Sequence, residues 1–297
     1  MIKKKTIIVT GGAGFVGSNM IGYLLKKTKY KIISIDNYSS GYKKNHLKNK
    51  RVKYLKANTK DIFRLIKYPK NIQAVFHFGE FARIYQSFIS MNECIDSNTV
   101  GTNSIFNFCL KNNIKLIYSA TSASLGNKGK DKNLSPYAFT KAKNLELLEN
   151  LKKWFDFKFE VIYFYNVYGP KQITSGKMST VIGIFEEAYK NKKPLPVVRP
   201  GTQTRRFTHI NDTIEICYLA WKKNLSRHYS ISSKQSHSII EVAKMFKSKI
   251  KYLHKRPGER YASALTKMNL SNKVYRYFGK IKLSDYISSL PHKPKND

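Results

Sequence analysis

The sequence is poor in acidic residues and in cysteine. Only 18 of its 297 residues are Asp or Glu, against 55 that are Lys or Arg, so the formal net charge is +37. The three cysteines, Cys94, Cys109 and Cys217, are an odd number, lie far apart and have no neighbouring pairs of histidines. This pattern argues against a disulfide framework and against a zinc site. We therefore expect reduced, buried thiols and no metal.

The sequence also lacks an apolar segment long enough to cross a membrane. Its first residues, MIKKK, run directly into a strand-like segment rather than into the apolar region of a signal peptide. We expect a cytoplasmic protein with no membrane partner.

Arginine is scarce as well, because Lys outnumbers Arg 45 to 10. Asn, Ile, Tyr and Phe are abundant, as expected when A/T-rich codons are favoured. The lysines are scattered, with no block of five or more and no aromatic stacking motif. Coding bias is the favoured interpretation of the charge, and affinity for a polyanion is the alternative. Nucleic acid is not expected as a partner, although a positive field would help to attract an anionic ligand.

The first half of the chain alternates segments typical of strands with segments typical of helices. We expect strands at residues 6–9, 31–35, 52–55, 72–78 and 114–119, and helices at 15–25, 62–66 and 98–110. Such alternation predicts a parallel, doubly wound sheet whose ligand lies at the carboxyl ends of the strands.

Four glycines follow the first strand. Gly11, Gly12, Gly14 and Gly17 lie between this strand and the first expected helix. Such a turn presents free backbone N–H groups and the positive end of the helix dipole, which favour an anion such as a pyrophosphate. Both the Gly-x-Gly-x-x-Gly spacing and a variant with glycines three apart are present, as in dinucleotide sites. A tight turn without a ligand is the alternative.

An acidic residue ends the second strand. Asp36 lies 19 residues after Gly17, where a carboxylate can accept hydrogen bonds from a ribose diol. Because it would repel a 2′-phosphate, it favours NAD over NADP, although Lys43 and Lys44 lie nearby. The alternative is that Asp36 only forms a turn ahead of Asn37.

Hydroxyl-bearing residues follow the fifth strand, and a tyrosine and a lysine come after them. Ser135 can cap a helix with Pro136 at its first position, which places Tyr137 and Lys141 on one helical face. A nearby cation favours the phenolate, so the phenol becomes a usable general base or acid. This spacing also arises by chance in a chain with 20 Tyr and 45 Lys. The hydroxyl-rich strand end and the glycine loop support the functional interpretation.

Nine short motifs occur in order along nearly the whole chain. They are TGGAGFVG at residues 10–17, DN at 36–37, HFGE at 77–80, Asn98 with GT at 101–102, SATS at 119–122, SPYAFTK at 135–141, YNVYGP at 165–170, RRFTHIND at 205–212 and RPGE at 256–259. On these motifs the sequence resembles the extended short-chain dehydrogenase/reductase family, the NAD-dependent nucleotide-sugar epimerases and dehydratases. Within that family it resembles UDP-hexose 4-epimerases most.

The resemblance implies catalytic roles for three residues. Tyr137 would take the proton of the sugar's C4 hydroxyl while hydride passes from C4 to the nicotinamide of NAD. Lys141 would bind the nicotinamide ribose and tune Tyr137, and Thr121 would hydrogen-bond the reacting oxygen.

The resemblance also implies the residues around the two ligands. The NAD site would comprise Gly11, Gly14, Phe15, Val16, Gly17, Asp36, Asn37, Asn58, Thr59, Phe78, Gly79, Asn98, Tyr137 and Lys141. The nucleotide-sugar site would comprise Ser122, Asn166, Arg205, Arg256, Glu259 and Ser263. Arg205 and Arg256 would clamp the diphosphate with forked guanidinium groups, and ordinary surface arginine is the alternative. Ser263 aligns with a position that limits bulk at the sugar's C2 substituent, so its small size favours room for an N-acetyl group.

Two features depart from the family pattern. Dehydratases of the family place an Asp-Glu pair after the catalytic hydroxyl residue, whereas Ser122 and Ala123 follow Thr121 here, so loss of water is not expected. Glu80 stands where the family usually has a small residue. It could reach the substrate, or pair with Arg83 and do nothing else.

The expected architecture is α/β, a doubly wound parallel (Rossmann) sheet with a smaller C-terminal substrate-binding lobe. Residues 1–168 would form the NAD-binding domain. Residues 169–297 would form mainly the substrate-binding lobe, with some segments returning to the Rossmann domain. In this lobe we expect helices at 181–189, 212–221 and 239–246 and a strand at 194–199.

The resemblance also implies a homodimer. In the family two long helices pair across a dimer axis, and here they would lie near residues 98–110 and 137–151. Their apolar residues could equally be ordinary core. These residues include Ile105, Phe108, Leu145 and Leu148.

Three functions remain open from the sequence. The first is a NAD-dependent 4-epimerase of a nucleotide sugar, of UDP-glucose/galactose or of the N-acetylated pair, with a transient 4-keto intermediate. The second keeps the fold but is a nucleotide-sugar 4-ketoreductase or 4,6-dehydratase. The third binds RNA through its charge, and the presence of every catalytic position argues against it.

Overall fold

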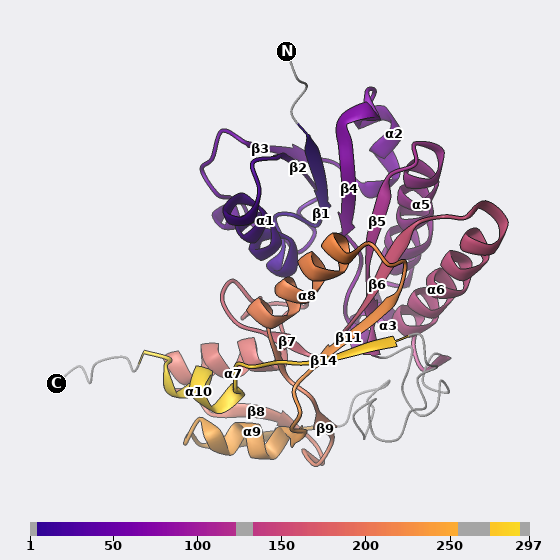
Figure 1. Ribbon diagram of the computed structural model, residues 1–297. Coiled ribbons are helices and arrows are strands. Elements are labelled where there is room, and N and C mark those ends of the chain that lie inside the picture. Colours follow the sequence, from indigo (N-terminus) through magenta and orange to yellow (C-terminus); the bar gives the residue numbers. More distant parts are fainter. Residues whose placement is uncertain (1–4, 123–132, 255–273, 292–297) are drawn as a thin grey trace.

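Eight parallel strands form the centre of the molecule (Figure 1). Their bounds are Thr6–Thr10 (β1), Lys31–Asp36 (β2), Val52–Lys56 (β3), Ile72–His77 (β4), Lys115–Thr121 (β5), Phe159–Phe164 (β6), His228–Ser232 (β11) and Val274–Phe278 (β14). The computed structural model describes residues 5–122, 133–254 and 274–291. The strand order is β14-β11-β6-β5-β4-β1-β2-β3, and neighbouring strands are parallel throughout. The prediction of a doubly wound parallel sheet is confirmed.

The registers bring the carboxyl ends of the central strands to one edge of the sheet. Thr10, at the end of β1, lies opposite Ile35 of β2 and His77 of β4. The residues after these strands are therefore neighbours in space. The strand order reverses between β1 and β4, which is where ligands bind in open α/β sheets.

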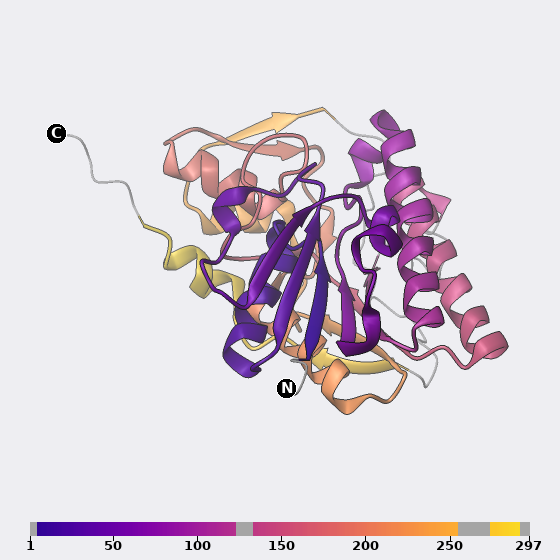
Figure 2. The same cartoon turned by 90° about the horizontal axis from the view of Figure 1, so that it is seen from above.

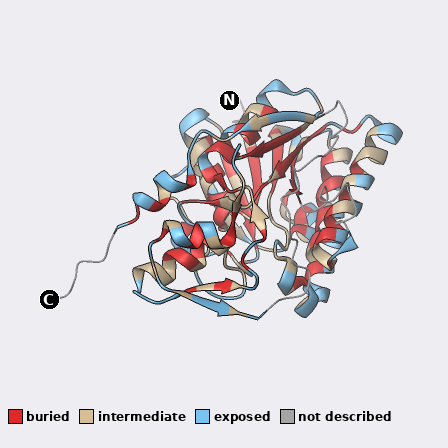
Figure 3. Ribbon diagram, turned by 90° about the horizontal axis from the view of Figure 1, so that it is seen from below, coloured by how far each residue is buried: buried red, intermediate tan, exposed pale blue. Residues whose placement is uncertain are grey.

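Helices cover both faces of the sheet (Figure 2). Their bounds are Phe15–Lys27 (α1), Ile62–Leu65 (α2), Thr102–Lys111 (α5), Pro136–Phe155 (α6) and Ile210–Lys223 (α8). Helices α1 and α8 pack on one face, with Ile7 and Val9 of β1. Helices α2, α5 and α6 pack on the other face, with Ile8 of β1. This alternation follows from the two-residue period of a strand, and it buries the sheet on both faces (Figure 3).

The second half of the chain also builds a smaller lobe beside the sheet (Figure 1). Its helices are Val181–Lys190 (α7), Ile239–Met245 (α9) and Leu283–Ser288 (α10), and its parallel strand pair is Leu195–Val198 (β8) with Ile250–Leu253 (β13). Phe185, Val197 and Phe246 lie in its apolar core. Two further short strand pairs, β7 with β10 and β9 with β12, complete the lobe and its junction with the sheet. Their strands are Val167–Tyr168 (β7), Thr204–Arg205 (β9), Thr208–His209 (β10) and His237–Ser238 (β12).

The structure differs from the predicted elements in several places. The helix expected at residues 98–110 begins as α5 only at Thr102, after a π-helical segment at Asp96–Gly101 (η4). Two short helices, Ile84–Ile89 (α3) and Met91–Ile95 (α4), precede it and were not predicted. They are too short to display a helical period in the sequence. Strands β6, β11 and β14 were not predicted either.

The three cysteines lie in the interior, as the sequence predicts. Cys94, Cys109 and Cys217 are all buried and free of disulfides. Burial raises the pKa of the Cys94 thiol to about 11, so this thiol is protonated at neutral pH. None of the helices in the described ranges has both the length and the apolar character that a membrane crossing needs.

Candidate active site

The glycine loop joins β1 to α1 and is closely packed. Gly11 has a φ of +67°, and a Cβ atom there would lie 2.7 Å from the carbonyl oxygen of Phe78. A Cβ atom at Gly17 would lie 2.1 Å from the carbonyl oxygen of Gly11. Gly14 is the N-cap of α1, and no side chain caps this helix. The N–H groups of the first turn are thus available to a phosphate, and the loop fits a dinucleotide.

Asp36 lies beside this loop. Its Oδ2 accepts a hydrogen bond from the Ala13 N–H at 2.9 Å, and its Oδ1 accepts one from the Tyr38 N–H at 2.7 Å. Burial raises the pKa of the Asp36 carboxyl, and these backbone hydrogen bonds oppose the shift. Asp36 therefore makes the local turn and is also fixed against the loop. Each of its carboxylate oxygens keeps one further lone pair, which can accept a hydrogen bond from a ribose hydroxyl.

The other residues predicted for the adenosine end of the cofactor lie nearby. The Nδ2 of Asn37 donates to the Oδ1 of Asn58 at 2.9 Å, which joins the ends of β2 and β3. Thr59 is buried, and a Cβ atom at Gly101 would lie 2.2 Å from its Oγ1. Thr59 therefore packs tightly against the chain just before α5.

A cavity of about 430 Å³ opens at the carboxyl edge of the sheet and extends to the smaller lobe. This volume lies within the range of small-molecule sites in proteins. The predicted site residues on its wall are Phe15, Val16, Phe78, Thr121, Ser122, Tyr137, Lys141, Asn166 and Arg205. The structure thus brings the predicted catalytic trio of Thr121, Tyr137 and Lys141 to one cavity.

Helix α6 places Tyr137 and Lys141 on the cavity wall. Its first turn is capped by Ser135, whose Oγ accepts a hydrogen bond from the Ala138 N–H at 3.1 Å. The Tyr137 N–H donates to the Oγ of Ser87 at 3.2 Å. The cap and this contact fix the start of the helix, so both side chains project from a rigid element.

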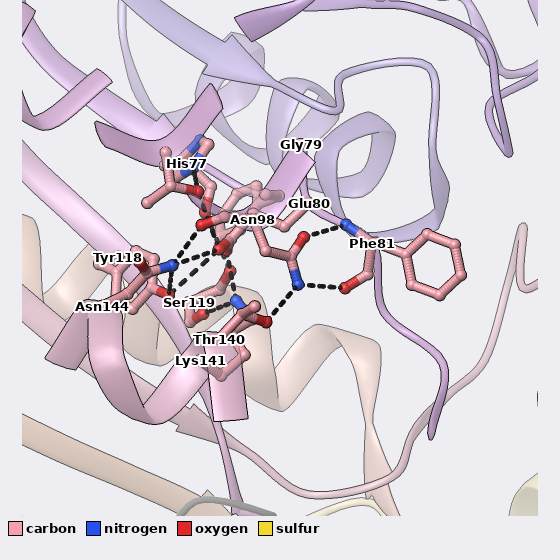
Figure 4. A network of polar contacts seen from close by, with 12 residues as sticks. His77, Gly79, Glu80, Phe81, Asn98, Tyr118, Ser119, Thr140, Lys141 and Asn144 are labelled. Atoms are coloured by element: carbon pink, nitrogen blue, oxygen red, sulfur yellow. Dashed lines mark hydrogen bonds and ion pairs between the residues drawn. The ribbon is translucent and has the colours of Figure 1, made fainter. Parts of the chain in front are cut away.

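Lys141 is buried and forms part of a polar network (Figure 4). Its ammonium group pairs with the carboxylate of Glu80 and donates to the carbonyl oxygen of Ser119 at 2.5 Å. The sequence left Glu80 with two roles, a contact with the substrate or a pair with Arg83. The described ion pair of Glu80 is instead with Lys141, 61 residues away in the sequence.

Asn98 and His77 hold the backbone of this region. Asn98 accepts a hydrogen bond from the Phe81 N–H at 2.7 Å and donates to the Phe81 carbonyl oxygen at 3.0 Å. His77 bonds to the hydroxyls of Thr10 at 2.7 Å and Thr102 at 3.0 Å. Burial lowers the pKa of His77 to about 4, so its ring is neutral at pH 7. The side chain of Asn98, which was predicted to contact the cofactor, instead hydrogen-bonds to the backbone of Phe81 and to the Thr140 hydroxyl at 3.3 Å.

Of the remaining predicted site residues, the structure describes two, Gly79 and Asn166, and does not describe the other three. Gly79 packs against the glycine loop, where a Cβ atom would lie 2.9 Å from the Gly11 nitrogen. Asn166 has a φ of +36°, and its Nδ2 donates to the carbonyl oxygen of Arg206 at 3.4 Å. The predictions at Arg256, Glu259 and Ser263 lie outside the described residues.

Arg83 and Gln203 are among the cavity residues that the sequence-based site did not include. Arg83 lines the cavity, and its Nε donates to the carbonyl oxygen of Met178 at 2.8 Å. Gln203 also lines the cavity, and its Oε1 is buried without a hydrogen-bond partner among the described residues. The rarity of arginine, which directed attention to Arg205, could have indicated Arg83 as well. No comparable signal distinguishes Gln203.

Comparison with known proteins places these features in a family. A sequence model of the NAD dependent epimerase/dehydratase family matches residues 7–232. A putative UDP-glucose 4-epimerase from Methanocaldococcus jannaschii is 26% identical over 305 residues, covering 98% of this chain and 94% of that protein. An ADP-L-glycero-D-manno-heptose-6-epimerase from Fusobacterium nucleatum is 27% identical, covering 80% of this chain and 77% of that protein.

A solved structure agrees with these sequence relatives. It is the UDP-N-acetylglucosamine 4-epimerase from Methanobrevibacter ruminantium M1 in complex with UDP-N-acetylmuramic acid. It superposes with a TM-score of 0.84 at 26% identity and with 97% of each chain covered. The family match spans more than half of the sequence, and the chain therefore belongs to the NAD dependent epimerase/dehydratase family, whose cofactor its glycine loop and Asp36 fit.

Proposed function

We propose that the protein is an NAD-dependent 4-epimerase of a nucleotide sugar, either UDP-glucose/galactose or the N-acetylated pair. The observation that carries this proposal is the meeting of Tyr137, Lys141 and Thr121 in one cavity next to the dinucleotide loop. Arg205 reaches the same cavity from the smaller lobe, where a guanidinium suits a diphosphate. The smaller lobe would accordingly bind the nucleotide sugar.

The proposed chemistry divides between cofactor and protein. Bound NAD, held by the glycine loop and Asp36, would supply the hydride chemistry at C4. Tyr137 takes the C4 hydroxyl proton as the C4–H bond breaks and returns it when the 4-keto sugar is reduced on its other face. Thr121 holds the reacting oxygen, and Lys141 holds the cofactor end of the site. No net oxidation occurs, so no external oxidant or reductant is consumed.

The scarcity of acidic groups on the described cavity wall favours this reaction over loss of water. Glu80 is the single carboxylate on the described wall of the cavity, and its charge is paired with Lys141. Ser122, directly after Thr121, carries no acid for elimination. A 4,6-dehydratase needs proton transfer at C5 and C6, for which these residues offer no group.

A panel of nucleotide sugars tests the proposal. Purified protein would be incubated with UDP-, GDP-, CDP- and dTDP-sugars without added cofactor, and the products would be separated. We expect interconversion of the C4 epimers of a UDP-sugar. If the small side chain of Ser263 leaves room at the C2 substituent, the N-acetylated pair is among the substrates. A 4-keto-6-deoxy product, or steady consumption of added NADPH, would contradict the proposal.

We also propose that the protein is a homodimer. The helices expected at the interface bury Ile105, Phe108 and Leu148 in the core instead. A different apolar surface lies over α3, α4, η4 and the start of α6. Its residues are Phe88, Ile89, Met91, Ile95, Val100 and Phe139, each at least 38% exposed. An apolar surface of this kind is typical of a protein interface.

An Ile89→Glu variant tests the dimer. Ile89 is 58% exposed on this surface, so a charge there would have to be buried in the interface. Light scattering on the wild type is expected to give the mass of two chains, and the variant the mass of one. Tyr68→Glu, at an 88% exposed position in the loop before β4, is the matched control and should leave the mass unchanged. A single-chain mass for the wild type at micromolar concentration would refute the dimer.

A further inference from the structure

Glu80 has no role in the reaction proposed above, yet it is one of the most firmly held side chains in the site. Its side chain is 2% exposed. One carboxylate oxygen pairs with Lys141, and the other accepts hydrogen bonds from Thr102 at 3.0 Å, Tyr118 at 3.1 Å and Asn144 at 3.3 Å (Figure 4). Its donors come from η4–α5, β5 and α6, so the carboxylate is fixed from several elements. It is therefore part of the built site and not a surface charge.

Lys141 is fixed by the same contacts. Its ammonium group has three N–H donors. Glu80 takes one, the carbonyl oxygen of Ser119 takes another, and the group lies 4.7 Å from the centre of the Tyr118 ring. Among the described contacts one donor thus remains for a ligand, and the ammonium is oriented before any ligand binds.

Three other titratable groups that face Glu80, His77, Cys94 and Tyr118, carry no charge at neutral pH. Burial lowers the pKa of His77 on β4 to about 4, and burial raises the pKa of Cys94 on α4 to about 11. Burial and the nearby Glu80 raise the pKa of Tyr118 on β5 well above its ordinary value. Tyr137 is the remaining titratable group of α6 here, and Arg83 faces Tyr137. Lys141 and Glu80 are therefore the charged pair of this network, and their charges cancel, while the guanidinium of Arg83 lies on the Tyr137 side of the cavity.

We propose that Glu80 is a positioning residue that neutralises the charge of Lys141 and thereby favours the oxidised cofactor over the reduced one. The nicotinamide ring is positively charged in NAD⁺ and neutral in NADH. Without the carboxylate, the buried ammonium would repel the oxidised ring and would leave the reduced form unaffected. The proposal rests on the proposed function only in placing the nicotinamide beside Lys141.

This preference has a consequence for the reaction. A cavity that favours NAD⁺ makes return of the hydride to the sugar favourable. A ketone that is reduced quickly has little time to leave the site. Glu80 would thus serve an enzyme that inverts a carbinol centre and does not release an oxidised product.

The test is the ratio of two dissociation constants, Kd for NAD⁺ divided by Kd for NADH, measured by titration calorimetry on protein stripped of cofactor. Glu80→Gln keeps the shape and removes the charge. We expect the ratio to rise about tenfold, from the repulsion between two charges in a partly buried site. If Glu80 only braces Lys141, both constants change by the same factor and the ratio stays constant. That result would overturn the proposal.

Three further variants keep the test decisive even if Glu80→Gln folds poorly. Lys141→Met removes the ammonium and leaves the Glu80 carboxylate unpaired, so the ratio of Kd for NAD⁺ to Kd for NADH should fall about tenfold. The double variant Glu80→Gln/Lys141→Met removes both charges and should restore the ratio of the wild type. Glu93→Gln removes an exposed carboxylate of α4 and is the matched control, with no expected change. A double variant that differs from the wild type as much as either single variant would also overturn the proposal.

The pH dependence of kcat/KM is a second measurement of the proposal. A purely structural role of Glu80 would not change it. Loss of the Glu80 charge leaves a net positive charge beside Tyr137, which favours the phenolate. The pH at which kcat/KM falls to half on the acid side should therefore move lower by about one unit in Glu80→Gln. Cofactor binding needs no turnover, so the Kd ratio decides the proposal even if the enzyme is not a 4-epimerase.

Discussion

Tyr137→Phe is expected to lose about 10³-fold in kcat while it keeps its fold and its affinity for NAD. The substitution removes one oxygen atom, and with it the group that takes and returns the C4 hydroxyl proton. The backbone of residue 137 remains anchored by its N–H donation to Ser87 at 3.2 Å and by the Ser135 cap, so α6 should form as before. Initial rates of C4 epimerisation, thermal melting and NAD titration measure the three quantities.

The matched control is Tyr68→Phe, the same chemical change at an 88% exposed position far from the cavity. It should leave all three quantities unchanged. A Tyr137→Phe enzyme that retained more than about a tenth of the wild-type kcat would exclude the phenol as the general acid and base.

Gly17→Ala is expected to weaken NAD binding by about 100-fold and to destabilise the fold by about 3 kcal/mol. The new Cβ atom would lie 2.1 Å from the carbonyl oxygen of Gly11. No rotamer change can relieve this overlap, because the neighbour is backbone. The loop would have to move away from α1, and the N–H groups of the first helical turn would no longer converge on a phosphate. Calorimetric titration with NAD and urea denaturation give the two numbers.

Gly22→Ala in the same helix is the control. Its Cβ atom would lie 3.4 Å from a Leu47 methyl group, an ordinary contact. Alanine favours a helix interior over glycine, so this variant should gain up to about 1 kcal/mol and bind NAD normally. Equal losses of NAD affinity in the two variants would mean that the effect comes from α1 in general and not from the loop.

The sequence predicted the parts of the site that are encoded locally. Gly11 to Gly17 and Asp36 belong to one strand–turn–helix–strand unit, whose signals lie within about one βαβ unit of sequence. Ser135 and Pro136 likewise mark the start of α6 within a few residues. These features need no knowledge of the rest of the fold, and the structure confirms the strand–turn–helix at residues 6–27 and the start of α6 at Pro136.

The features that the sequence did not predict depend on contacts between distant segments. The sequence left Glu80 either to reach the substrate or to pair with Arg83, three residues away, because pairing in a sequence can be judged only by proximity along the chain. The sheet edge brings it instead to Lys141. Strand β6 was missed for a related reason: it contains Glu160, which is fully buried because Lys115 at 2.6 Å and two backbone N–H groups neutralise and bind it.

The assignment of apolar helix residues had the same limit. Ile105 and Phe108 could belong to the core or to a dimer interface, and the structure buries both against the sheet. Four of the six exposed apolar residues of the proposed interface lie on α3 and α4, which are too short for a hydrophobic period to indicate them. Periodicity identifies a buried face, but it does not identify what covers that face.

The fate of the hydrogen at C4 tests the central claim most directly. The protein would convert its UDP-sugar in D2O, and NMR and mass spectrometry would locate any deuterium in the product. If Tyr137 moves only the hydroxyl proton while the hydride leaves and returns, the product is inverted at C4 and keeps its original hydrogen there. Deuterium at C4 would mean that the carbon exchanges a proton with solvent, and it would contradict the account.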